Sequence, residues 1–285
     1  MGVTNEYGKL RKLVLSKPDN LRWMPFNDIT EALLAEGKTF TQEDAYEQYR
    51  EFCEAFESNG VEIMYIPSTK EKDLPYQMFT RDFGVATRKG VLLGNFFYPE
   101  RRGEEVYAEK FFVTQGIPIF GKVPKGFFEG GDITYIDNET LACGLGGRSN
   151  KEGIEEARKL VKEELGLDLI AVEFPAKYIH LDEIYLRLAE RACLACVPAL
   201  PDYFLKILRD KKIEIIEVSL EEQHKVGNNV VAIDDKMIVS FKENESVNRK
   251  MEAFGFEVLK PSMSIFIGCA GGPHCATFPL ERDGV

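Results

Sequence analysis

The sequence predicts an α/β fold built from five similar units that close on one another like the blades of a propeller. Helix, strand and hairpin return in the same order along the chain, and hairpins begin near residues 83, 132, 183 and 229. A fixed period of about 46 to 51 residues is typical of repeat proteins, in which no unit buries its apolar face alone. No stretch between units resembles a linker, so we expect residues 1–285 to form one domain. An ordinary α/β sheet with alternating elements is the alternative.

The first elements follow from apolar spacing and from residues typical of helix ends. One helix is expected to begin after Thr41 and to end at Gly60, because Thr caps helices well and Gly often terminates them. The expected elements, in order, are a strand at 11–17, this helix at 41–60, a strand at 61–67, a hairpin over 83–96, a helix around 103–115, a strand at 117–121 and a hairpin over 132–146.

The same pattern continues to the end of the chain. The expected elements are a helix from 150 to about 164, a strand at 167–175, strands within 184–198, a helix at 201–212, a strand at 213–219, a hairpin over 228–241, a helix at 243–256 and a strand at 257–261. A last strand is expected over 264–272, and we expect it to pair with the N-terminal strand.

The composition indicates a soluble protein with a small partner. Lys and Arg number 36 against 47 Asp and Glu, so the formal charge is -11, which argues against nucleic acid and anionic membranes as partners. A small cationic substrate fits this charge. No run approaches the roughly 18 apolar residues of a membrane span, and the N-terminus does not resemble a secretion signal, so we expect a cytoplasmic protein. A homodimer is compatible with the sequence.

Six cysteines are scattered along the chain without the density of a disulfide scaffold. Cys193 and Cys196 have CxxC spacing, but no second pair or nearby His accompanies them, and they lie in an apolar run. We therefore expect both in the core and predict no metal site.

Four polar motifs fall at corresponding edges of the predicted units. They are MFTRDFG with Asp82, FFEGGDITY with Glu129 and Asp132, YIHLDEIYL with His180 and Asp182, and GGPHCATFP with Cys275. Each alone has an ordinary structural explanation, as a turn residue, a core His or a buried Cys. In a closed ring, however, loops at equivalent edges converge on the axis, so these side chains are expected to meet.

A thiol, an imidazole and several carboxylates together suit one kind of chemistry. A thiolate is a strong nucleophile, and an adjacent His can keep it ionised and move protons. Surrounding carboxylates would raise the pKa of the thiol, but a cationic planar guanidinium reverses that effect and can be gripped by paired hydrogen bonds. The set therefore predicts attack by Cys275 on a guanidinium carbon.

The ordered motifs FTRD, FEGGD, HLD and GGPHC resemble those of the pentein superfamily of guanidine-modifying enzymes, and look most like arginine deiminase. The resemblance extends from Asp82 to Cys275, and it implies a five-bladed α/β propeller that converts arginine and water to citrulline and ammonia. The length is closer to that of the dimethylarginine dimethylaminohydrolases. No cofactor is implied.

The resemblance also implies roles for individual residues. Cys275 would form a covalent thiouronium intermediate, and His180 would protonate the leaving amine and then activate water. Glu129 would hold His180 or the substrate, and Asp82 and Asp182 would bind the guanidinium nitrogens. In addition, Arg101 and Arg148, each 19 residues after a motif carboxylate, would bind the substrate carboxylate, although solvated surface charge is their ordinary explanation.

Two departures from the deiminase pattern leave the substrate open. Tyr76 stands where deiminases carry Asn, and Ala270 where they carry Arg. Dimethylarginine dimethylaminohydrolase and arginine dihydrolase activities are the main alternatives, with agmatine deiminase nearby. An amidinotransferase, or a non-catalytic pentein that binds a ligand, is less favoured.

Overall fold

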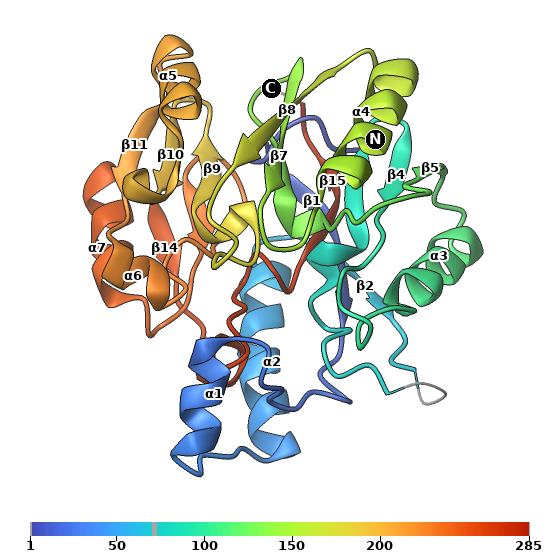
Figure 1. Cartoon of the computed structure of the whole chain (residues 1–285). Helices are drawn as coiled ribbons and strands as arrows, with labels where there is room; N and C mark the ends of the chain where they lie inside the picture. The colour runs from blue at the N-terminus through green and yellow to red at the C-terminus, as the bar shows by residue number, and fades with distance from the viewer. Residues whose placement is uncertain (1, 70–72, 285) are drawn as a thin grey trace.

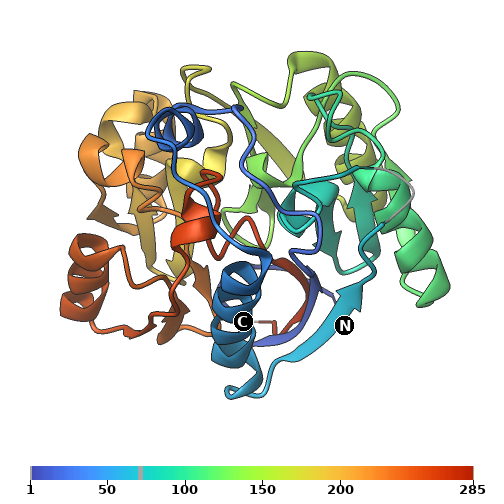
Figure 2. The same ribbon diagram turned by 90° about the horizontal axis from the view of Figure 1, so that it is seen from below.

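Five small sheets stand around a common centre in the computed structural model, which describes residues 2–69 and 73–284 (Figures 1 and 2). Each sheet has three strands, of which two form an antiparallel pair and the third lies parallel to the middle strand. Parallel pairing needs a crossover, which a helix supplies in every unit. In Figure 2 the chain passes around the ring in colour order. The predicted propeller of five α/β units is confirmed.

The strands of the five units can be given in ring order. Unit 1 contains β15 (Phe278–Arg282), β1 (Leu10–Ser16) and β2 (Glu62–Ile66). Unit 2 contains β3 (Gly84–Thr87), β4 (Gly90–Leu93) and β5 (Ile119–Lys122), and unit 3 contains β6 (Ile133–Tyr135), β7 (Thr140–Leu145) and β8 (Asp168–Glu173). Unit 4 contains β9 (Tyr185–Ala189), β10 (Ala192–Ala195) and β11 (Glu214–Glu217), and unit 5 contains β12 (Val231–Ala232), β13 (Met237–Val239) and β14 (Glu257–Leu259).

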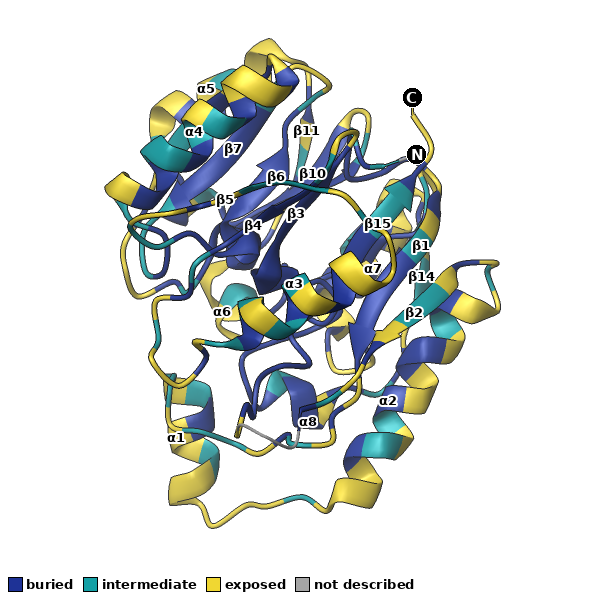
Figure 3. Cartoon of the chain, turned by 90° about the vertical axis from the view of Figure 1, so that its right-hand side faces the viewer, coloured by how far each residue is buried: buried dark blue, intermediate teal, exposed yellow. Residues whose placement is uncertain are grey.

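Helices cover the outside of the ring, each with a buried face toward the sheets and an exposed face toward solvent (Figure 3). The crossover helices are α2 (Gln42–Glu57), α3 (Glu104–Thr114), α4 (Lys151–Leu165), α5 (Asp202–Asp210) and α7 (Glu245–Phe254). Thr41 and Asp44 close a capping box at the start of α2, which buries Phe52 and Phe56. Helix α4 ends at Gly166, whose φ of 71° favours glycine.

The end of the chain differs from the prediction. Residues 264–272 do not form a strand: Ser264–Ile267 form the short helix α8, and the strand that pairs with β1 is β15, in which Phe278 lies opposite Val14. A short apolar run does not distinguish helix from strand by its pattern. The ring of Trp23 packs against Gly268 and its Nε1 donates to the carbonyl of Ile265 at 2.9 Å, which fixes the helical turn.

Two further helices were not predicted, α1 (Asp28–Ala35) and α6 (Leu220–His224). Asn27 caps α1 by accepting from the amide of Thr30, and a capping box that begins at Ser219 starts α6. Both line the cavity described below. Within the described residues no helix is long and apolar enough to cross a membrane.

Candidate active site

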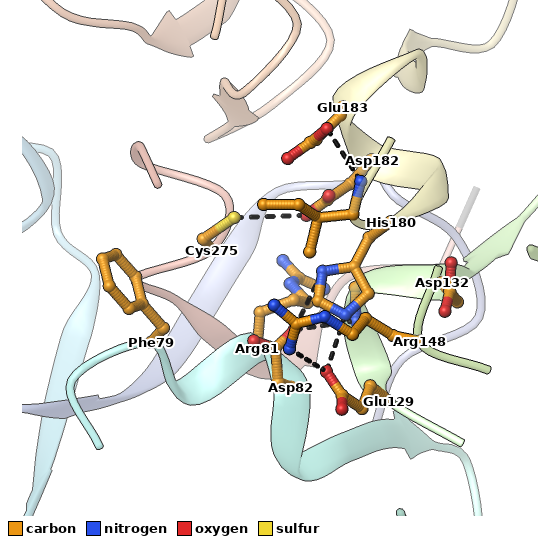
Figure 4. A network of polar contacts seen from close by, with 12 residues as sticks. Phe79, Arg81, Asp82, Glu129, Asp132, Arg148, His180, Asp182, Glu183 and Cys275 are labelled. Carbon is orange, nitrogen blue, oxygen red and sulfur yellow. Dashed lines mark hydrogen bonds and ion pairs between the residues drawn. The ribbon is translucent and has the colours of Figure 1, made fainter. Parts of the chain in front are cut away.

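The polar motifs of the sequence meet in one buried cluster, because each precedes the first strand of its unit. Single-turn helices η1 (Thr80–Phe83), η2 (Gly130–Asp132) and η3 (Leu181–Glu183) hold three of them just before β3, β6 and β9. The turn that carries Cys275 precedes β15. Figure 4 shows Cys275, Asp182, His180 and Glu129 in this cluster. The predicted convergence of these loops is thus what the structure displays.

His180 lies between two carboxylates. Its Nε2 is 2.8 Å from Oε2 of Glu129, and its Nδ1 is 3.7 Å from Oδ1 of Asp82. A Cβ at Gly131 would lie 2.7 Å from Nδ1 of His180, so this close approach requires glycine. Burial would lower the pKa of His180, but the charge of Asp82 and the hydrogen bond to Glu129 raise it to about 10. The ring is therefore an imidazolium at neutral pH and can donate a proton.

Glu129 is held by contacts to both oxygens. Its Oε1 accepts from the amide of Phe97 at 2.9 Å, and its Oε2 lies 3.5 Å from Nη1 of Arg148. Burial would raise the pKa of Glu129, but the charge of Arg148 and the hydrogen bond from His180 bring it well below its usual value. Glu129 is thus an anion that keeps His180 protonated and oriented.

The loops themselves are tied together by Asp132, the second acid of FFEGGDITY. Its two oxygens accept from the amides of Ser149 and Leu181, at 3.1 and 3.0 Å. Asp132 therefore joins η2 to the segment after β7 and to η3, and it supports the cluster from outside.

Cys275 faces Asp182 across the cluster. Its Sγ lies 3.5 Å from Oδ2 of Asp182, which also contacts Nδ1 of His274 at 2.7 Å. Burial, followed by the charges of Asp182 and Asp82, raises the pKa of the Cys275 thiol. Burial likewise raises the pKa of Asp182 to about 8. In the free protein the thiol is therefore neutral, and a cation placed between these carboxylates would favour the thiolate.

The second oxygen of Asp182, Oδ1, is buried and has no hydrogen-bond partner among the described residues. A buried carboxylate oxygen without a donor is costly, and a guanidinium supplies donors in a fixed fork. Oδ1 of Asp182 is therefore available to accept from a donor-rich cation.

Asn229 also contacts Cys275 and was not among the predicted site residues. Its Nδ2 donates to Sγ of Cys275 at 2.9 Å, and its side chain is fully buried. Asn229 carries no charge and has no motif neighbours, so its residue type gave no signal. The position of Asn229 was the available signal, because Asn229 lies at the start of the fourth predicted hairpin, where the other predicted hairpins carry their polar motifs.

Arg101 is not placed as predicted. Its Nη1 contacts Oδ2 of Asp82 at 2.5 Å, and its Nε and Nη2 donate to the two oxygens of Glu104 at 2.9 and 2.7 Å. The side chain is buried. Because each nitrogen of the guanidinium already has an acidic partner, Arg101 is not free to meet a substrate carboxylate, and it holds Asp82 in place instead.

Arg148, in contrast, lines an open cavity of about 570 Å³ beside the cluster. Its guanidinium stacks on the ring of Tyr98, 3.9 Å from the centroid. The walls come from the start of α1, from α6 and from the segment before η3, and the other lining residues include Phe26, Asn27, Tyr178, Glu183 and Ala270. The guanidinium of Arg148 therefore presents a positive charge at the cavity wall.

The two departures from the deiminase pattern lie in different surroundings. Tyr76 is buried, and its hydroxyl contacts the backbone nitrogen and oxygen of Met24, at 3.2 and 3.3 Å. It packs edge-on against Phe26 and so supports the cavity wall. Ala270 lines the cavity directly, where its methyl group offers no charge.

Asp82, Glu129 and His180 bring ligand-type atoms within 4.8 Å of one another, a spacing that a metal ion could bridge. His180 is protonated and hydrogen-bonded to Glu129, however, so its ring offers no lone pair to a metal ion. Cys193 and Cys196 are fully buried, which confirms their prediction as core residues.

Comparison with known proteins identifies the family. A family model described as N,N dimethylarginine dimethylhydrolase, eukaryotic, matches residues 23–282. The chain is 29% identical to uncharacterized protein YkgA of Bacillus subtilis (strain 168), over 97% of this chain and 94% of that protein. It is 26% identical to an arginine deiminase of Streptococcus equi subsp. zooepidemicus (strain MGCS10565) over 74% of this chain, and the match spans 62% of the deiminase.

Solved structures agree in fold. The N-terminal domain of ArgZ, an arginine dihydrolase from the Ornithine-Ammonia Cycle in Cyanobacteria, matches with a TM-score of 0.82 at 21% identity, over 96% of this chain and 98% of that one. A dimethylarginine dimethylaminohydrolase adduct with 4-chloro-2-hydroxymethylpyridine matches with a TM-score of 0.74 at 20% identity, over 94% and 99% of the two chains. The chain therefore belongs to the N,N dimethylarginine dimethylhydrolase family, among the guanidino-group hydrolases of the pentein superfamily.

Proposed function

We propose that the chain hydrolyses the guanidino group of an arginine-like amino acid, converting arginine and water to citrulline and ammonia, with Cys275 as nucleophile. The observation that carries this proposal is the buried cluster itself. The Cys275 thiol lies 3.5 Å from Asp182, one of whose oxygens lacks a partner, and an imidazolium paired with Glu129 stands on the neighbouring loop.

In the proposed reaction the guanidinium binds between Asp82 and Asp182. Its positive charge offsets the carboxylates that raise the pKa of the thiol, so Cys275 releases its proton to solvent when substrate is present, because His180 is already protonated. The thiolate attacks the guanidinium carbon, and a C–S bond forms. His180 gives its proton to one amino nitrogen as the C–N bond breaks, and ammonia leaves.

The resulting thiouronium is hydrolysed in the second half of the reaction. The now neutral His180 takes a proton from water, and the hydroxide adds to the same carbon. The C–S bond then breaks, the hydroxyl proton of the adduct passes to the sulfur, and citrulline leaves with the thiol restored. Glu129 favours the imidazolium, so the proton is in place on His180 for the first transfer, and the neutral ring is a stronger base toward water in the second.

The amino-acid end of the substrate is assigned to the cavity beside the cluster. Arg148 would pair with the α-carboxylate, and Tyr98 beneath it would hold the guanidinium of Arg148 in place. Arg101 is assigned to the positioning of Asp82, because its contacts are all internal.

A methylated arginine is the second candidate substrate, since the matching family model is described by dimethylarginine. The two candidates differ in the leaving group, which is ammonia for arginine and dimethylamine for dimethylarginine. The unpartnered oxygen of Asp182 favours a guanidinium with free N–H donors, so we place arginine first.

One experiment distinguishes these substrates. The purified protein and its Cys275→Ala variant are incubated separately with arginine, asymmetric dimethylarginine, agmatine and citrulline, and products are identified by mass spectrometry. Citrulline and ammonia from arginine support the proposal, whereas ornithine from arginine indicates a dihydrolase that removes both nitrogens. Turnover that needs an added acceptor amine indicates an amidinotransferase, and binding of arginine with no product from any compound would contradict a catalytic role.

A further inference from the structure

Asn229 belongs to unit 5, and it occupies the position that supplies a proposed catalytic or substrate-binding group in each of the other four units. It lies just before β12, as Asp82 and Glu129 precede the first strands of units 2 and 3 and His180 precedes that of unit 4. Cys275 holds the equivalent place before β15. Asn229 is fully buried, and it is the only uncharged amide among these five described positions. Its place in the ring predicts that Asn229 takes part in the same proposed reaction.

The orientation of the Asn229 amide is fixed by its surroundings. Its Oδ1 accepts from the backbone amides of Gly272 and Cys275, each at 3.0 Å. Since both partners are donors, the oxygen has to face them, and the NH₂ group then has to face Sγ of Cys275, 2.9 Å from Nδ2. One side chain thus anchors the turn that carries the thiol and donates to the sulfur.

The remaining groups near the thiol mostly oppose its ionisation. The charged side chains that act on it, from η1 and η3, are Asp82, Arg81, Asp182 and Glu183. His274 and His180 lie against two of these carboxylates, Asp182 and Asp82. The nearest of these to Sγ is the carboxylate of Asp182, at 3.5 Å. Arg81 points its Nε to the carbonyl of His274 rather than to the sulfur. Asn229 is therefore the polar donor in direct contact with Sγ among the described residues.

We infer that Asn229 is a positioning residue, which aims the Cys275 thiol at the guanidinium carbon and stabilises the thiolate through its N–H donor. The catalytic part of this role rests on the proposed function. The effect on the thiol itself does not, because the contact exists without substrate.

The test is the reactivity of Cys275 toward iodoacetamide between pH 7 and 10, followed by peptide mapping that separates Cys275 from the other cysteines. Asn229→Asp keeps the shape and the acceptor oxygen but replaces the donor with a carboxylate. Asn229→Ala removes both. Asn248→Asp is the matched control, because Asn248 is a buried amide of α7 that donates to the carbonyl of Phe241.

A hydrogen bond to a charged group is worth enough to change a rate about 10-fold to 100-fold. We therefore expect Asn229→Asp to slow alkylation of Cys275 at pH 8 by about 10-fold or more and to move its pH profile upward, while Asn248→Asp leaves both unchanged. The kcat for arginine should fall with little change in KM. A profile like that of the native protein in Asn229→Asp would overturn the inference.

Two further outcomes are separable. If Asn229→Asp does not fold, as judged by circular dichroism, Asn229→Ser replaces it, since the shorter hydroxyl cannot reach both the turn and Sγ; an unchanged profile in that variant overturns the inference equally. If the native protein turns over no guanidino compound but the alkylation profile shifts as expected, the proposed function fails and the effect of Asn229 on the thiol stands.

Discussion

Replacing Arg148 by Ala is expected to remove most of the preference for arginine over agmatine, which lacks the α-carboxylate. Arg148 is buried at the edge of the cavity, and Tyr98 holds its guanidinium in one plane. A charge-assisted hydrogen bond is worth about 1.5–3 kcal/mol, and each 1.4 kcal/mol changes a constant tenfold. Arg148 also lies 3.5 Å from Glu129, which already meets part of its charge. We therefore expect an effect in the lower part of that range: in Arg148→Ala, the ratio of kcat/KM for arginine to that for agmatine should fall by about 10-fold to 30-fold.

The assay compares kcat/KM for arginine and agmatine in the native protein, Arg148→Ala and Arg148→Lys. Arg148 also lowers the pKa of Glu129. A fall in kcat/KM for both substrates therefore indicates a disturbed Glu129–His180 pair, whereas a fall for arginine alone indicates a lost contact to the substrate α-carboxylate. Arg11→Ala is the control, since Arg11 pairs with Asp283 at the surface. Equal use of agmatine and arginine by the native protein, or unchanged discrimination in Arg148→Ala, would refute the assignment.

The remaining predictions concern the groups around the cluster. The kcat/KM for arginine should rise with pH as Asp182 loses its proton near pH 8 and fall as His180 loses its proton near pH 10. Asp182 must be charged to bind the guanidinium, and His180 must be protonated to release the amine. A profile that is flat across this range would contradict both roles. Arg101→Ala leaves Asp82 and Glu104 without their cation, so chemical denaturation should show a loss of about 3–5 kcal/mol in the free energy of unfolding, and a stability equal to the native value would contradict the buried network. Cys193→Ala should lower the free energy of unfolding by about 1 kcal/mol and leave kcat unchanged, because Cys193 is a buried core residue. A change in kcat would contradict a purely structural role for Cys193.

The sequence predicted the ring and most of the cluster because both depend on position along a repeat. Three motifs precede the hairpins of their units and the turn with Cys275 precedes β15, so closure of the ring brought Asp82, Glu129, His180 and Cys275 together without any information on side-chain packing. The strand expected over 264–272 was wrong, because the three apolar residues 265–267 fit either a helix or a strand.

The two arginines show what spacing alone does not determine. Both lie 19 residues after a motif carboxylate, yet Arg101 has Glu104 one helical turn away and pairs with it, whereas Arg148 is followed by Ser149 and stays at the cavity. Asn229 was missed for a related reason, because an amide gives no charge signal in the sequence. Its role depends on which way the amide faces, and the backbone donors of a distant turn fix that direction.

The central claim is that Cys275 attacks the guanidinium carbon, and trapping of the intermediate tests it most directly. The protein is mixed with arginine, quenched in acid during turnover and digested, and the peptide that contains Cys275 is examined by mass spectrometry. We predict an added mass equal to arginine less ammonia on Cys275, and no such adduct in Cys275→Ala or without substrate. An adduct on another residue, or citrulline formation by Cys275→Ala at the native rate, would contradict the mechanism.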